Sequence, residues 1–358
     1  MAKILLFSDI HVHPHKKSQE RLQDCLRCLR WCFEQAVEND VDAVLFGGDL
    51  LHERQKIDSL TFTEVFKTLE EFQSKRFQTY LLLGNHDMWF SNSWNVNSIY
   101  PFGALRNFQT VTETKEIKIL DSVWHFIPYT HDPIKELEKL PIQNINSSYL
   151  LAHLAIDGSK LNSSGSVSDV AIEHDGDMTK VDRSLFSDYK HVFLGHYHSA
   201  QKLTKTIEYI GSPLQLSFGE AHENKHVILL DTETNKMKYI NNDFSPKHFY
   251  IKEDQIDNYD PEILKKSFVT ILSENTIDTK TKKDIEKKIE KLDLASVQIR
   301  QNAKKMEEHT LHDAKSILVD ESKIVEKYVE QVNPQNLDKS VLIDIGMQIV
   351  HFADAEGE

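Results

Sequence analysis

Short apolar runs alternate with helical patterns through the first two-thirds of this chain, and that alternation limits how it can fold more than any other feature. The runs predicted to be buried strands are Ile4–Phe7, Ala43–Phe46, Tyr80–Leu83, Val123–Ile127, Tyr149–Leu151, Val192–Leu194, Ile207–Ile210 and Val227–Leu230. Helical spacing of apolar residues between the first three runs predicts parallel strands, and the later strands are expected to form a second sheet packed on the first. The predicted fold class is α/β, a two-sheet β-sandwich flanked by helices.

Polar residues that can hold a metal or move a proton follow five of these runs. They are Asp9 and His11, then Asp49, then Asn85 with His86 and Asp87, then His153, and finally His196 with His198. Loops at the carboxyl ends of strands gather at one edge of an α/β sheet, so we expect these side chains to share a crevice.

Carboxylate, amide and imidazole groups without a thiolate suit Mn²⁺ or Fe²⁺ and also accept Zn²⁺ or Mg²⁺. We expect two divalent ions, with Mn²⁺ favoured and Mg²⁺ as the alternative. The expected ligands are Asp9, His11, Asp49, Asn85, His153, His196 and His198. Asp49 is expected to bridge, because one carboxylate can face two cations. His86 is the candidate proton donor to the leaving oxygen, and Asp87 is expected to orient its ring.

A single buried histidine is more often structural than catalytic, but five motifs in this order indicate a two-metal phosphoesterase site. The ordered set resembles the calcineurin-like metallophosphoesterase superfamily. A second segment, Tyr209–Pro213 followed by Gln215, Ser217, Phe218 and Glu220, is similar to the SbcD nuclease family, whose eukaryotic relatives act in double-strand break repair. In length the chain is closer to the recombination endonuclease subunits of large bacteriophages.

The resemblance implies a role for each site residue. One metal would be held by Asp9, His11, Asp49 and His198, and the other by Asp49, Asn85, His153 and His196. His86 would be the catalytic histidine. His52 would assist at the phosphate, since the family places a second functional histidine three residues after the bridging aspartate.

The domain organisation expected for the 358 residues is a metallophosphoesterase nuclease domain over 1–240, a small α+β capping domain over 241–306 and a C-terminal helical hairpin over 307–358. The resemblance implies that the hairpin docks on the coiled-coil base of an SbcC-type ATPase, and that the protein is a homodimer within a heterotetramer. The hairpin could instead dock on the catalytic body. Residues 157–169 form either a surface loop over the site or a disordered insertion.

The net charge of −14 argues against a protein that grips DNA over a broad basic surface, so a partner is expected to supply much of the affinity. Lys280–Lys305 is the one basic stretch, with nine Lys or Arg against four Asp or Glu, and it is either a solvated helix face or a DNA contact. The three cysteines, Cys25, Cys28 and Cys32, fit packing along one side of a helix better than zinc or redox chemistry.

No apolar stretch reaches the roughly 20 residues of a membrane helix, and no export signal is recognised. We therefore expect a cytoplasmic protein, in the host cell cytoplasm if a phage encodes it. The predicted function is a Mn²⁺-dependent DNA nuclease, the nuclease subunit of an SbcC/SbcD-like complex in recombination, repair and replication. It would act as an exonuclease on duplex ends and an endonuclease on single strands or hairpins. The alternatives are a small-substrate phosphodiesterase or phosphatase, and a scaffold without metals.

Overall fold

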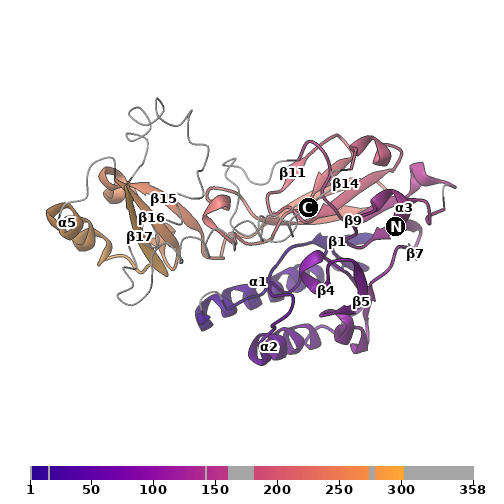
Figure 1. The fold of residues 1–358 in the computed structure, drawn as a ribbon, viewed down its shortest axis with the longest axis horizontal. Coiled ribbons are helices and arrows are strands. Elements are labelled where there is room, and N and C mark those ends of the chain that lie inside the picture. Colours follow the sequence, from indigo (N-terminus) through magenta and orange to yellow (C-terminus); the bar gives the residue numbers. More distant parts are fainter. Residues whose placement is uncertain (1, 15–16, 142, 160–180, 274–278, 302–358) are drawn as a thin grey trace, which may run out of the picture. The chain divides into compact units, whose positions relative to one another are not determined.

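A computed structural model of the chain describes residues 2–14, 17–141, 143–159, 181–273 and 279–301 (Figure 1). The chain divides into two compact units, one of residues 1–273 and 277–300, the other of residues 274–276 and 301–358. The first unit contains two six-stranded sheets and a smaller three-stranded sheet. The predicted hairpin at 307–358 and most of the loop at 157–169 lie outside the described residues.

The first large sheet is mixed, with four parallel strands at its centre and one side. Its order is β14 (Lys236–Asn241), β13 (His226–Asp231), β1 (Lys3–Phe7), β2 (Ala43–Phe46), β3 (Gln78–Leu82) and β6 (Phe108–Val111). β13 runs antiparallel to β1, and β14 runs antiparallel to β13. The helices α1 (Gln19–Glu38) and α2 (Ser59–Glu70) connect β1, β2 and β3, as the sequence predicts.

The second large sheet also contains four parallel strands, but an antiparallel strand flanks them at each edge. Its order is β11 (Gln201–Lys202), β12 (Ile207–Tyr209), β10 (His191–Gly195), β9 (Tyr149–His153), β8 (Ser122–Ile127) and β7 (Lys115–Ile119). The strands β8, β9, β10 and β12 are parallel, and β7 and β11 pair antiparallel at the two edges. A short hairpin of β4 (Met88–Phe90) and β5 (Ser93–Asn97) stands apart from both sheets.

Alternation along the strands explains why the sheets form a sandwich. Ile4 and Leu6 of β1 lie in one buried cluster with Trp124 and Phe126 of β8, so these faces meet between the sheets. The other face of β1 joins a second cluster with α1 and α2, which cover the outer side of the first sheet (Figure 1). Central strands buried on both faces read as continuous apolar runs. The two-sheet α/β architecture is therefore confirmed.

The three cysteines lie on α1 as free thiols, fully inside the cluster beneath the first sheet. Ser18 caps this helix, since its side chain accepts a hydrogen bond from the backbone of Arg21. None of the three belongs to a candidate metal cluster among the described residues. They act as small apolar core residues, which confirms the packing interpretation.

The small sheet follows the large ones in the sequence. It contains β15 (His248–Lys252), β16 (Phe268–Ser273) and β17 (Ser296–Gln301), with α4 (Pro261–Leu264) and α5 (Thr279–Ile289) in the connections. Ile251, Ile271 and Ile285 belong to a hydrophobic cluster separate from those of the large sheets, and the capping role of this region stays a prediction. The boundary at residue 240 stays a prediction. Within the described ranges, every helix is too short or too polar to cross a membrane.

Candidate metal centre

The predicted ligands meet where strands of both large sheets end. Asp9 and His11 follow β1, Asp49 follows β2, and Asn85 opens a 3₁₀ turn after β3. His153 is the last residue of β9, and His196 with His198 follows β10. Side chains from far apart in the sequence are thus delivered to one place by the carboxyl ends of parallel strands.

The loops after β1 and β2 are tied together by backbone hydrogen bonds beyond the ends of the strands. The amide of Asp9 donates to the carbonyl of Gly48 at 2.9 Å, and that of His11 donates to the carbonyl of Asp49 at 3.1 Å. The bond from Val12 to the carbonyl of Leu50, at 2.9 Å, continues the ladder. The positions of these ligands therefore rest on backbone pairing as well as on side-chain contacts.

Four of the predicted ligands adopt the left-handed backbone region that non-glycine residues rarely occupy: Asp9 at φ 54°, His11 at 45°, Asp49 at 60° and His196 at 103°. Such conformations cost about 1–3 kcal/mol each and cluster at functional sites. At Gly84 a side chain is excluded, because a Cβ there would lie 2.2 Å from Oδ1 of Asp49.

One ligand cluster comprises Asp9, His11 and His198, whose candidate ligand atoms lie within 4.8 Å of one another. Nε2 of His11 lies 3.0 Å from Nε2 of His198 and 3.5 Å from Oδ2 of Asp49. The same atom lies 4.0 Å from Oδ1 of Asp9. Two imidazoles and two carboxylates converge on one point.

The second cluster comprises Asp49, His153 and His196, together with Asn85. Oδ1 of Asn85 lies 2.9 Å from Nε2 of His153 and 3.1 Å from Nδ1 of His196. Oδ2 of Asp49 lies 3.3 Å from the same nitrogen of His153. Asp49 belongs to the second cluster, and its Oδ2 also lies 3.5 Å from Nε2 of His11 in the first, so this carboxylate lies between the two.

The donor set of this second cluster fits a cation. Nδ1 of His153 donates to the carbonyl of Gly47 at 2.7 Å, so Nε2 of the neutral ring carries a lone pair. That lone pair faces the oxygens of Asp49 and Asn85, and three acceptors facing one another require a proton or a metal between them. Burial disfavours the charged ring, but the carboxylates of Asp49 and Asp9 outweigh it and raise the pKa of His153 to about 9. This position therefore stabilises positive charge.

Glu220 contacts the predicted ligand His198 on the side of its ring that faces away from the first cluster. Nδ1 of His198 donates to Oε1 of Glu220 at 3.3 Å, which leaves Nε2 for the cluster. Lys225 and the hydroxyl of Ser212 donate to the other oxygen of Glu220, at 2.6 Å and 3.1 Å. Their charge and hydrogen bonds outweigh burial and hold the pKa of Glu220 below its usual range. In the sequence, Glu220 and Ser212 stood out only as part of the segment that is similar to the SbcD family. Nothing in the sequence pointed to Lys225.

The prediction that Asp87 orients the ring of His86 requires a correction. Both oxygens of Asp87 accept backbone hydrogen bonds: Oδ2 from Asp49 and Gly84, and Oδ1 from Leu50 and Leu51. The ring of His86 is oriented instead by the carbonyl of His52, which lies 2.6 Å from Nδ1. Because it accepts hydrogen bonds from four backbone amides, Asp87 holds the loop that carries Asp49. It does not orient the ring of His86, the candidate proton donor.

His86 and His52 lie beside the first cluster. The two rings stack with centroids 5.4 Å apart, and the ring of His86 lies edge-on to that of His11 at 4.7 Å. Burial lowers the pKa of His86. With Nδ1 bonded to a carbonyl, the other ring nitrogen is the one that can exchange a proton with a substrate.

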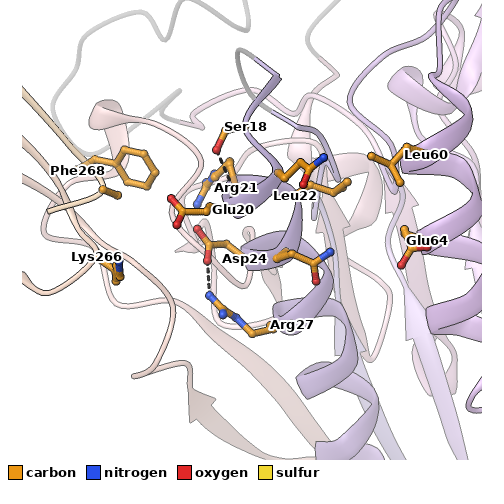
Figure 2. A pocket seen from close by; sticks show the side chains of 13 residues that line it. Ser18, Glu20, Arg21, Leu22, Asp24, Arg27, Leu60, Glu64, Lys266 and Phe268 are labelled. Carbon is orange, nitrogen blue, oxygen red and sulfur yellow. Dashed lines mark hydrogen bonds and ion pairs between the residues drawn. The ribbon is translucent and has the colours of Figure 1, made fainter. Parts of the chain in front are cut away.

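A pocket of about 520 Å³ lies elsewhere, at the start of α1 (Figure 2). Its lining includes Arg21, Asp24 and Arg27 of the helix and Phe268 of β16. Asp24 and Arg27 pair with each other in this lining. Acidic and basic groups both line this pocket, and none of its lining residues belongs to the two clusters. The metal centre therefore remains the candidate functional site.

Comparisons with known proteins agree with this geometry. Calcineurin-like phosphoesterase is the family that matches, over residues 2–229. The chain is 29% identical to protein 244L of Invertebrate iridescent virus 6, named as a phosphoesterase, over 64% of this chain and 76% of that protein. It is 24% identical to the SbcD component of the SbcCD nuclease of Staphylococcus epidermidis, over 68% and 69%. Exonuclease subunit 1 of Enterobacteria phage T4 is 19% identical, over 60% of each chain.

The family match covers both large sheets up to β13 and every residue of the two clusters. The two clusters of His and Asp side chains, with Asp49 in contact with a histidine of each, are consistent with the two-metal site of a phosphoesterase. The chain belongs to the calcineurin-like phosphoesterase family.

Proposed function

We propose that this protein is a Mn²⁺-dependent DNA nuclease and the nuclease subunit of a complex with an SbcC-type ATPase. The observation that carries the chemistry is the pair of clusters with Asp49 between them. The DNA substrate is supported by relatives named as components of the SbcCD nuclease and of a phage exonuclease.

The proposed ligands follow the clusters. Asp9, His11, Asp49 and His198 would hold one ion, and Asp49, Asn85, His153 and His196 would hold the other. When bound, such ions supply Lewis acidity toward phosphate oxygens and lower the pKa of a water molecule. His86 protonates the leaving oxygen through the ring nitrogen opposite its bond to the His52 carbonyl. His52 stacks on His86 and contacts the phosphate from the same side.

The partner part of the proposal rests on charge and on the relatives. The chain carries a net charge of −14, which disfavours DNA except at a site that cations neutralise. Lys282, Lys283 and Lys287 are exposed on α5, as both a solvated face and a DNA contact require. An ATPase bound to residues 307–358 would supply the missing basic surface, and dimerisation would give the complex two nuclease sites.

One assay tests the function. Purified protein is incubated with Mn²⁺ and linear duplex DNA, with and without the ATPase and ATP, and in parallel with bis(p-nitrophenyl) phosphate. We expect both substrates to be cleaved, with EDTA stopping both reactions and ATP accelerating only the DNA reaction. Cleavage of the small diester with intact DNA under every condition would favour a small-substrate phosphodiesterase instead.

A truncation tests the partner. Removing residues 310–358 should leave metal binding and cleavage of the small diester unchanged, because both clusters lie before residue 200. It should abolish co-purification with the ATPase and the ATP-stimulated degradation of DNA. Unchanged co-purification would rule out the hairpin as the binding element.

A further inference from the structure

A third group of possible metal ligands lies beside the metal centre. It consists of His13, His52 and Glu53, whose candidate ligand atoms lie within 4.8 Å of one another. Nε2 of His13 lies 3.4 Å from Oε1 of Glu53, and the ring centroids of His13 and His52 lie 4.7 Å apart. The proposed two-metal chemistry uses only His52 of these three, so the convergence of the other two on it requires a separate explanation.

The backbone ladder between the loops after β1 and β2 brings these side chains together. Val12 and Leu51 pair across the two loops as a parallel bridge, and the amide of His52 donates to the carbonyl of Val12 at 3.4 Å. Val12 and Leu51 are both buried in the hydrophobic cluster that includes α1 and α2. Because successive side chains of paired backbone point to opposite sides, the residues that follow, His13 and His52, point away from that cluster.

The donors and their spacing fit one divalent cation. Two imidazoles and one carboxylate, with a fourth position for water, form a known ligand set for Zn²⁺, which lies about 2.0–2.2 Å from each ligand atom. Two ligands of such a tetrahedral ion lie about 3.3 Å apart, close to the 3.4 Å between His13 and Glu53. Zn²⁺ binds a given set of nitrogen and oxygen ligands more tightly than Mn²⁺ does, so Zn²⁺ is the better candidate here.

His52 connects this group to the metal centre. It also belongs to a group with His11 and His86, and its ring stacks on that of His86. Side-chain exposure rises from 2% at His11 to 20% at His13 and 53% at Glu53, so the third group is open to solvent. An imidazole nitrogen that ligates a cation can neither donate nor accept a proton. A cation on His52 therefore competes with its contact to the substrate phosphate.

We propose that His13, His52 and Glu53 bind a third divalent cation, preferably Zn²⁺, and that this ion inhibits hydrolysis by withdrawing His52 from the substrate. The binding of the ion does not depend on the proposed function. The inhibition rests on it, because it requires the role given there to His52. The two ions of the metal centre keep all their ligands when the third ion binds.

The test adds Zn²⁺ to the Mn²⁺-loaded protein and to the variants His13→Ala and Glu53→Gln. His222→Ala is the matched control, because His222 is an exposed histidine outside every candidate metal cluster of the described residues. After equilibrium dialysis, elemental analysis counts both metals per chain. Hydrolysis of bis(p-nitrophenyl) phosphate is measured at the same concentrations of Zn²⁺.

We expect the wild type and His222→Ala to keep two Mn²⁺ and to bind one Zn²⁺, with half of the inhibition reached when half of this site is filled. His13→Ala and Glu53→Gln should keep both Mn²⁺ and the full rate without Zn²⁺, because neither residue is a ligand of the metal centre. Their affinity for the third ion should fall by more than the roughly 10- to 100-fold that follows loss of a group orienting a ligand, since a ligand itself is lost. Inhibition should then require correspondingly more Zn²⁺.

Wild-type affinity for the third ion in either variant would overturn the site. Exchange of Zn²⁺ for Mn²⁺ as the only binding in the wild type would also overturn it, because the metal centre alone would explain that result. A third ion that leaves the rate unchanged would overturn the inhibition. Failure of the nuclease proposal is distinguishable from these results: a protein that binds the third ion and cleaves the small diester, but leaves DNA intact, contradicts only the DNA substrate.

Discussion

The histidine that begins β10 and the two histidines just beyond its end lie among different groups of side chains. His191 begins the strand, and its Nε2 lies 2.8 Å from Oε1 of Glu208. The hydroxyl of Tyr239 donates to the second oxygen of Glu208, also at 2.8 Å. Each carboxylate oxygen of Glu208 therefore accepts a hydrogen bond from a side chain of the protein.

Beyond the other end of the strand, His196 and His198 instead contact other side chains of the candidate metal centre. Nδ1 of His196 lies near the oxygen of Asn85, and Nε2 of His198 lies near Nε2 of His11. His11 and His153 of the candidate metal centre are as deeply buried as His191, so burial alone does not distinguish a candidate ligand from a structural histidine. The distinction lies in whether the surrounding donors and acceptors balance, and only the carboxyl end of β10 lacks that balance.

Asp49→Asn is the substitution that we expect to disrupt the candidate metal centre most severely. Asn tolerates the left-handed backbone at this position but cannot bridge two cations. We expect loss of both ions and a fall of more than about 10⁴-fold in hydrolysis, since bound metals supply several kcal/mol to the transition state. Metal analysis after dialysis and the diester assay measure this. Retention of two ions per chain would contradict the shared role of Asp49.

His86→Ala should separate chemistry from metal binding. Both clusters keep their ligands, so two ions should remain bound. Hydrolysis should fall by about 10²- to 10⁴-fold, the usual contribution of a positioned proton donor. Metal analysis and the rate of DNA degradation are measured on the same preparation. A wild-type rate would mean that another group protonates the leaving oxygen.

Glu220→Gln and Glu208→Gln form a matched pair across the two ends of β10, because each glutamate is buried and contacts one histidine. Glu220→Gln should weaken Mn²⁺ binding by about 10- to 100-fold, the usual effect of losing a group that orients a metal ligand. Glu208→Gln should leave the affinity unchanged. Titration with Mn²⁺ measures both, and equal losses would show that the effect is one of general stability.

Glu208→Gln should instead change stability, and in a way that depends on pH. The bonds from His191 and Tyr239 outweigh burial and lower the pKa of Glu208 below its ordinary 4.5. Stabilisation by the carboxylate is therefore present above pH 4.5 and is lost as the pH falls through the lowered pKa. We expect the variant to lose about 1–3 kcal/mol in free energy of unfolding at neutral pH. In urea denaturation without metal, the difference should shrink toward pH 3, and a constant difference would contradict it.

The sequence predicted the central strands because they are buried on both faces and leave continuous apolar runs. It missed β7 and β14, whose sequences Lys115–Ile119 and Lys236–Asn241 mix charged and apolar residues. Such edge strands expose part of their surface, so their composition is close to that of a loop.

The seven predicted ligands come together because each follows a strand, and strand order carries that information. The roles of Asp87 and Lys225 could not be predicted from the sequence. Asp87 binds amides of a loop that lies 36 to 38 residues away, a pairing that spacing cannot reveal. The role of Lys225 is recognised only from its contact with Glu220 in the folded protein.

The backbone ladder that continues past β1 and β2 has a thermodynamic consequence. Ordering a loop as an ion arrives would cost about 1–2 kcal/mol per residue in conformational entropy, but here Asp9, His11 and Asp49 are already held by folding. Metal binding should therefore show little change in heat capacity. The amide hydrogens of Asp9 and His11 should resist exchange with solvent in the metal-free protein, as those of a folded sheet do.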